Sequence, residues 1–176
     1  LARSAPAPGP LPAGGELVLR VDPQARWLWD RCASEWGASA IRDAAHLNWR
    51  IADHPRHRYE SLGAFDSQHV LCGLAGGRRA DFVTQNLGVV LEWLVPPAES
   101  AVGEVLLATL VQRAREEGVR ALVTLVPPWS AWFFWLQERG FLVHSTDYLM
   151  AAVTFDPRYD APWLCGHWWY QLSATD

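Results

Sequence analysis

The sequence has 176 residues, half of them hydrophobic, which is enough to bury one sizeable core. Its formal net charge of −4 and its pI near 5.8 give no basis for expecting nucleic-acid binding. All 15 residues counted as lysine or arginine are arginine, so a catalytic lysine, a Schiff base and a P-loop are excluded.

The three cysteines, Cys32, Cys72 and Cys165, have unrelated spacings and apolar neighbours. This pattern favours buried free thiols in a reducing cytosol over a disulfide framework. No apolar run reaches the roughly 18 residues of a membrane span, and no secretory signal opens the sequence. We therefore expect a cytoplasmic protein that contacts neither membrane nor nucleic acid.

Residues 1–15 consist mainly of Pro, Ala and Gly, which is typical of a linker or a mobile arm. Because an interdomain type of linker comes first and the first residue is Leu1 rather than Met, we expect another domain to precede this one in the full-length protein. The alternating segment Glu16–Asp22 predicts a first strand. Asp22 and Pro23 then open a predicted helix that continues to Trp36.

A second helix is predicted over Ala40–Ala52, with Ser39 as its N-cap and His54-Pro55 as its stop. An antiparallel meander of strands should follow, at Arg58–Phe65, at Gln68–Gly73 or somewhat beyond, and in a segment ending at Val95. The predicted breaks are Phe65-Asp66-Ser67 and Gly76-Gly77-Arg78-Arg79.

The segment Leu87–Val95 is apolar enough for a strand that is buried on both faces. Beyond Pro96 and Pro97, Ser100 is the predicted N-cap of an amphipathic helix, and Gly118 is its predicted C-cap. The remaining predictions are a strand at Arg120–Val126, a helix at Ser130–Arg139 ended by Gly140, and two strands within Phe141–Phe155. The tail, residues 156–176, is too aromatic to be free in water and should pack on the rest of the chain.

This order of elements predicts an α/β (α+β) fold with a mixed, mostly antiparallel sheet flanked by helices. It resembles the GNAT superfamily of N-acetyltransferases over residues 16–155, and three local motifs carry the resemblance. They are LVPPAESAVGEVLLATL at the strand-to-helix junction, Glu138-Arg139-Gly140-Phe141 after the short aromatic helix, and Ala45–Arg50 followed by Asp53-His54-Pro55 and Arg58-Tyr59-Glu60. The third motif is similar to the L-x-W-R…P…Y signature of longer bacterial proteins with two GNAT domains in tandem, of which this would be the C-terminal one.

The resemblance implies an acyl-CoA N-acyltransferase fold that uses acetyl-CoA as cosubstrate and a small amine as acceptor. In that fold two parallel strands splay apart, here those ending at Val95 and Val126. The main chain of Trp93, Leu94 and Val95 would then bind the pantetheine arm, with Thr124 and Leu125 on the other side. The diphosphate would lie at the following helix start, at Ser100, Ala101 and Gly103.

Glu92 lies where members of the superfamily frequently carry a catalytic glutamate; alternatively, it pairs with a buried arginine such as Arg50 or faces a cavity. The tyrosine that serves the superfamily as general acid is replaced by Leu136, which leaves Tyr148 and Tyr59 as the nearest substitutes. No metal site is predicted, because Asp53, His54 and His57 lack a further ligand.

Ala98 and Ala101 stand where the superfamily has Arg or Gln and Gly, and Glu99 and Glu104 flank the helix start. Acids at that end satisfy the helix dipole and would repel a diphosphate. An alternative is therefore a non-catalytic, degenerate GNAT-like module that packs its aromatic helix or tail on an N-terminal acetyltransferase domain. A third is a cleft for another small ligand without turnover.

Overall fold

A computed structural model describes residues 14–23, 25–82, 84–145 and 153–174. The strands are β1 (Glu16–Leu17), β2 (Ala38–Ser39), β3 (Glu60–Phe65), β4 (Leu71–Phe82), β5 (Thr84–Leu94), β6 (Ala121–Thr124) and β7 (Trp168–Trp169). The helices are α1 (Ala25–Ala33), α2 (Ala44–Leu47), the π-helical turn η1 (Asn48–Ala52), α3 (Ser100–Glu116), α4 (Ala131–Gln137), α5 (Ala161–His167) and the 3₁₀ turn η2 (Leu172–Ala174).

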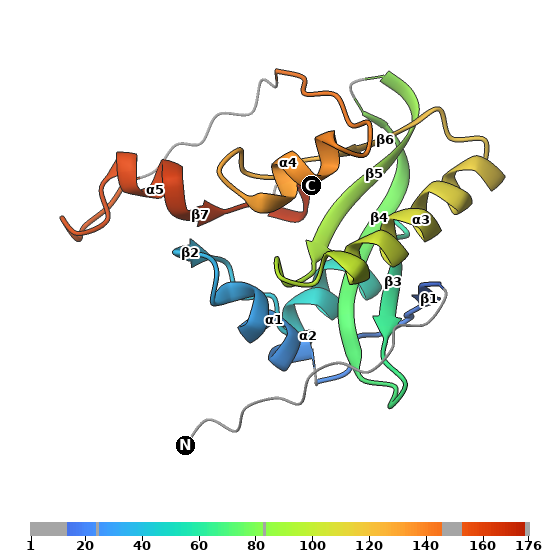
Figure 1. Ribbon diagram of the computed structural model, residues 1–176, viewed down its shortest axis with the longest axis horizontal. Coiled ribbons are helices and arrows are strands. Elements are labelled where there is room, and N and C mark those ends of the chain that lie inside the picture. The colour runs from blue at the N-terminus through green and yellow to red at the C-terminus, as the bar shows by residue number, and fades with distance from the viewer. Residues whose placement is uncertain (1–13, 24, 83, 146–152, 175–176) are drawn as a thin grey trace.

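The main sheet has the strand order β1-β3-β4-β5-β6 (Figure 1). Its neighbours are antiparallel except β5 and β6, which run parallel from Leu87 opposite Ala121 to Val90 opposite Thr124. The predicted mixed, mostly antiparallel sheet is confirmed. So is the prediction that the strand before α3 and the strand after it are neighbours.

The second predicted helix starts later than expected, because Asp43 rather than Ser39 caps it. The Asp43 carboxylate accepts a hydrogen bond from the His46 N–H at 3.0 Å. Ser39 instead belongs to β2, which pairs in parallel with β7 near the end of the chain. A sequence pattern that covers only local residues could not indicate this long-range pairing.

The sequence predicted a break between strands at Gly76–Arg79. This prediction is wrong, because the stretch lies inside β4. Gly76 is opposite Glu92 and Gly77 is opposite Val90, so Leu91 is an extra residue in a β-bulge. A Cβ on Gly77 would lie 2.5 Å from the Val89 carbonyl oxygen. The glycine thus permits close approach of two strands and does not make a turn.

The helix boundaries in the C-terminal half agree well with prediction. Glu99 occupies the N-cap position of α3, so Ser100, the predicted N-cap, is instead its first residue; Gly118 follows the helix with a φ of +66°. Gly140 follows α4 with a φ of +88°, a left-handed conformation that favours glycine. Within Phe141–Phe155, the described residues 141–145 and 153–155 form no strand, and the other residues of that range lie outside the described ones.

Helices α1 and α3 pack on the same hydrophobic core, which is formed with β4 and β5. Leu87, Val89 and Leu91 face a second, smaller cluster together with Leu172 from the tail. The tail is held by Trp169, which is buried and stacks on Trp36 with 4.4 Å between ring centroids. Near the end of the chain η2 contacts β5, and β7 lies beside β2 (Figure 1). Among the described residues, no helix is long and apolar enough to cross a membrane.

The three cysteines do not share one environment, contrary to the prediction. Cys32 and Cys72 are buried and Cys165 is exposed on α5; all are free thiols. Burial raises the pKa of the Cys32 thiol, which suppresses its reactive thiolate form.

We expect an aromatic disulfide reagent to modify Cys165 quickly in the folded protein and Cys32 only in denaturant. Cys165→Ser should abolish the fast phase, and its persistence in that variant would contradict the assignment.

Candidate functional site

A gap opens between β5 and β6 where their pairing stops. The last paired residues are Val90 and Thr124, and the Thr124 hydroxyl donates to the Val90 carbonyl oxygen at 3.1 Å. Strand β5 continues to Leu94 without β6 beside it. The main chain of this final stretch can therefore bind groups that come from elsewhere.

The tail supplies those groups. The side-chain carboxamide of Gln171 accepts from the Trp93 N–H at 3.1 Å and donates to the Trp93 carbonyl oxygen at 2.9 Å. The Val95 carbonyl oxygen accepts from the indole N–H of Trp132 at 3.2 Å. Leu94 pairs with Leu74 of β4. The three residues expected to offer main-chain groups to pantetheine thus lie at the gap, and protein groups bind Trp93 and Val95.

Glu92 belongs to a buried network that the tail completes. One of its carboxylate oxygens accepts from Nε of Arg42 at 2.7 Å, and the other accepts from the Ser173 hydroxyl at 2.6 Å. The side chains of Glu92 and Arg42 are at most 1% exposed. The buried arginine that pairs with Glu92 is Arg42, not Arg50 as the sequence suggested. Arg50 joins the network by donating to the Ser173 carbonyl oxygen at 2.7 Å.

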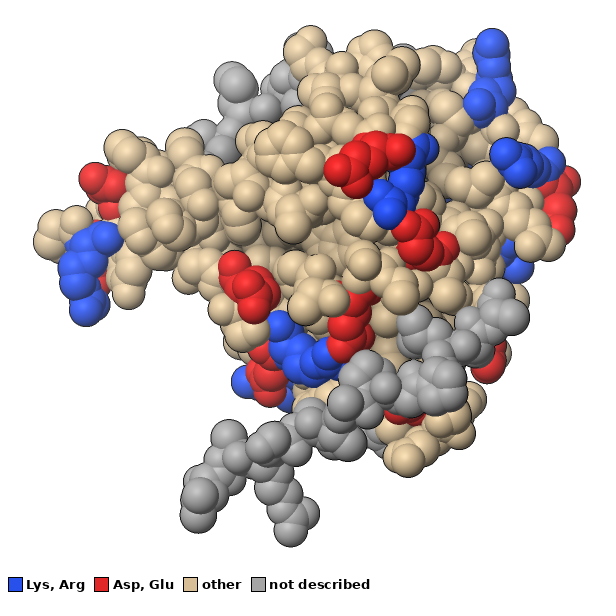
Figure 2. Space-filling model, viewed as in Figure 1, with Lys and Arg blue, Asp and Glu red and all other residues tan. Residues whose placement is uncertain are grey.

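The start of α3 is less acidic than the sequence implied. Glu99 forms an ion pair with Arg31 of α1, and Glu104 accepts from Nε of Arg139 at 2.7 Å. Figure 2 shows acidic and basic side chains interspersed among uncharged surface on this face. Because each acid has an arginine partner, the expected repulsion of a diphosphate is largely cancelled. Ser100 and Ala101 are exposed beside these pairs.

Gly103, the third residue expected to approach a diphosphate, is buried under α4. A Cβ at this position would lie 2.8 Å from the Trp132 ring. The structure therefore gives a packing reason for this glycine. Packing also accounts for Leu136, because its side chain is buried in α4.

The two candidate tyrosines differ in what the structure says of them. Tyr59 lies near Arg50 and Ser173, at the edge of the Glu92 network, around a space too small to hold a water molecule. Tyr148 lies outside the described residues. The histidines near Tyr59, His54 and His57, stack on each other at 5.2 Å between ring centroids. Among the described residues, no three His, Cys, Asp or Glu side chains gather as metal ligands.

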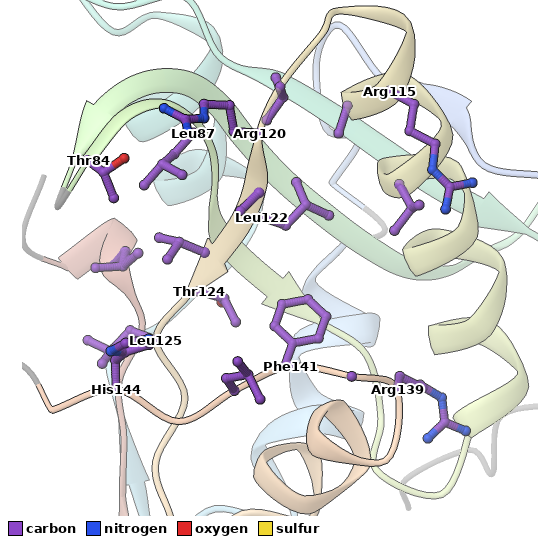
Figure 3. Close-up of a pocket in the computed structure, with 18 of the residues that line it drawn as sticks. Thr84, Leu87, Arg115, Arg120, Leu122, Thr124, Leu125, Arg139, Phe141 and His144 are labelled. Carbon is purple, nitrogen blue, oxygen red and sulfur yellow. The ribbon is translucent and has the colours of Figure 1, made fainter.

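A larger cavity of about 1100 Å³ lies along the other edge of β6, where no described strand pairs (Figure 3). Thr124 and Leu125, expected to line the gap, also line this cavity. Figure 3 shows Phe141 close to Leu122 and Thr124, with Arg115 on α3. Its walls are mainly apolar and contain none of the buried polar groups around Glu92, so we place the candidate site in the gap.

Four residues of the site were not indicated by the sequence: Arg31, Arg42, Gln171 and Ser173. The sequence places Arg31 on the polar side of a predicted amphipathic helix, where an arginine is ordinarily solvated. In the structure it instead pairs with Glu99. The tail offered a weak signal, because polar residues that follow several tryptophans in a packed segment are buried with them. Only the fold brings Gln171 to a strand 78 residues away.

Comparison with solved structures identifies this architecture. A GNAT-family protein from Desulfovibrio desulfuricans is 19% identical, with 75% of this chain and 86% of that one covered and a TM-score of 0.54. AAC(6')-Iy, solved in complex with the bisubstrate analogue CoA-S-monomethyl-acetylneamine, is 16% identical, with 74% of this chain and 92% of that one covered and a TM-score of 0.52. A GCN5-related N-acetyltransferase from Kribbella flavida is 16% identical over 69% and 76%, with a TM-score of 0.52. No protein-family profile and no curated protein matches the sequence. The chain thus has the GNAT fold, at identities that establish the fold alone.

Proposed function

We propose that the chain binds an acyl-CoA in the gap between β5 and β6 and transfers the acyl group to an amine. The observation that carries this proposal is the carboxamide bound to the Trp93 main chain. The pantetheine arm of CoA contains amides, which offer the same donor and acceptor pair. A main-chain site that binds one amide through both groups can bind another.

The proposed reaction is direct transfer. The amine nitrogen bonds to the acyl carbon, the carbon–sulfur bond of the thioester breaks, the nitrogen loses a proton and the CoA sulfur gains one. Glu92 is the candidate base, because it is the carboxylate on the strand next to Trp93. Both of its oxygens are engaged in the described conformation, so it accepts a proton only after Ser173 has moved.

The GNAT superfamily has Arg or Gln near the diphosphate at the position of Ala98. We propose that the guanidinium of Arg31 supplies the positive charge there instead. This guanidinium extends from α1 to Glu99 at the start of α3, and its Nη1 is buried without a hydrogen-bond partner among the described residues. The indole N–H of Trp93 is a second buried donor without a partner in the described part of the chain. An acceptor-rich ligand with a diphosphate and carbonyl groups would match these donors.

Isothermal titration with acetyl-CoA tests the proposal. The wild-type chain should bind it, and Glu99→Gln should bind about threefold to tenfold more tightly, because Arg31 is released toward the diphosphate. Glu117→Gln removes the same charge at the other end of α3 and should leave the affinity unchanged. Absence of binding by both the wild type and Glu99→Gln at millimolar ligand would remove the enzymatic proposal.

The second candidate function is a non-catalytic GNAT-like module that packs on a preceding acetyltransferase domain. The observation that favours it is the Glu92 network, whose donors use both carboxylate oxygens. Leu136, which offers no proton, also favours it. Binding of acetyl-CoA without transfer to any amine tested would support this candidate over the first. The aromatic side chains on α4 include Phe134, which is 60% exposed and available for such packing.

A further inference from the structure

Two residues of the tail occupy the polar groups of the proposed site. Gln171 holds the Trp93 main chain, and Ser173 contacts Glu92 through its hydroxyl and Arg50 through its carbonyl oxygen. Both residues are almost completely buried. Between them, Leu172 is buried against the cluster on β5. A short segment near the chain's end thus covers both the proposed pantetheine position and the candidate base.

We propose that Gln171–Ser173 are an intramolecular latch that competes with acyl-CoA for the gap. This inference rests on the proposed function and describes how binding of the acyl-CoA is regulated. One amide N–H and one carbonyl cannot hold the Gln171 carboxamide and a pantetheine amide at the same time. Binding of the cosubstrate therefore requires the latch to leave, and the observed affinity falls with the fraction of molecules in which the latch is closed.

The latch can open while the contacts that hold the preceding residues of the tail remain in place. Trp169, immediately before Tyr170, stacks on Trp36, and β7 pairs with β2. Neither interaction involves residues 171–173. Rotation of the chain after β7 would release Gln171 and Ser173 while the tryptophan stack stays in place. The same movement would free one oxygen of Glu92, so that cosubstrate access and exposure of the base are coupled.

The first test measures acetyl-CoA affinity in a latch variant and in a matched control. Gln171→Ala removes both bonds to Trp93 and should tighten binding by at least about tenfold. Gln68→Ala, in the exposed turn between β3 and β4, should bind as the wild type does. Equal affinities in the wild type and Gln171→Ala would overturn the latch but leave the proposed function standing. Absence of binding in every variant would overturn the proposed function and the latch with it.

The second test uses the unmodified chain and does not depend on the folding of a variant. Hydrogen–deuterium exchange is followed in a peptide that covers residues 170–176, with and without saturating acetyl-CoA. We expect faster exchange of this peptide when acetyl-CoA is bound, since the displaced latch loses its protection. A peptide from α1 serves as the control and should not exchange faster. Unchanged or slower exchange of the tail peptide in the bound state would overturn the latch.

Discussion

Arg42→Met is expected to lower the free energy of unfolding by about 3–5 kcal/mol. Glu92 would keep its bond to Ser173 but lose the only guanidinium that contacts its carboxylate among the described residues, and it is 1% exposed. An unpaired carboxylate at that depth has no water to solvate it. Urea unfolding followed by tryptophan fluorescence and by far-ultraviolet circular dichroism measures the loss.

The double variant Arg42→Met/Glu92→Leu should recover most of that loss, because a buried pair replaced on both sides by apolar groups leaves no charge behind. Arg20→Met is the matched control. The Arg20 and Asp53 side chains form an ion pair at the surface, with 61% and 50% exposure, and its removal should change stability little. A loss as small for Arg42→Met as for Arg20→Met would show that Glu92 is not held as a buried carboxylate.

The sequence was sufficient to predict the fold, because the elements around α3 are defined by local signals. Ser100 and Gly118 mark the ends of that helix, and an apolar run precedes it. The N-terminal helices were harder to delimit, since Ser39 has the pattern of an N-cap but pairs with a segment near the end of the chain. Glycines Gly76 and Gly77 were misleading for a related reason. In β4 they allow the neighbouring strand to approach closely, whereas in a turn a glycine permits an unusual backbone conformation. The sequence alone does not distinguish these two roles.

The strand that carries the candidate site was predicted, but the groups that contact its end were not. Trp93, Val95 and Glu92 lie where the strand pattern places them. The groups that bind them, however, come from α4, the tail and residue Arg42, and no periodicity relates these segments. The charge at the start of α3 was misjudged for the same reason. Local sequence shows Glu99 and Glu104, whereas Arg31 and Arg139 approach only in the folded chain.

Trp132→Ala should destabilise the fold by about 3–5 kcal/mol, the usual cost of removing a buried tryptophan. Trp132 is 2% exposed, packs edge-on against Trp93 and Trp135, and donates its indole N–H to the Val95 carbonyl oxygen. Phe134→Ala on the same helix is the control. That side chain is 60% exposed, so we expect a change within about 0.5 kcal/mol.

A double-mutant cycle with Gly103 then identifies why this glycine stands at the start of α3. Gly103→Ala should be clearly destabilising in the wild type, because the new methyl group would lie 2.8 Å from Cη2 and 2.9 Å from Cζ3 of Trp132. In the Trp132→Ala background the two closest contacts are gone and the nearest atom is Cζ2 of Trp135 at 3.3 Å, so the same substitution should cost much less. Equal costs in both backgrounds would contradict the packing explanation. The requirement for glycine would then come from the helix start itself, as the approach of a diphosphate to its N–H groups demands.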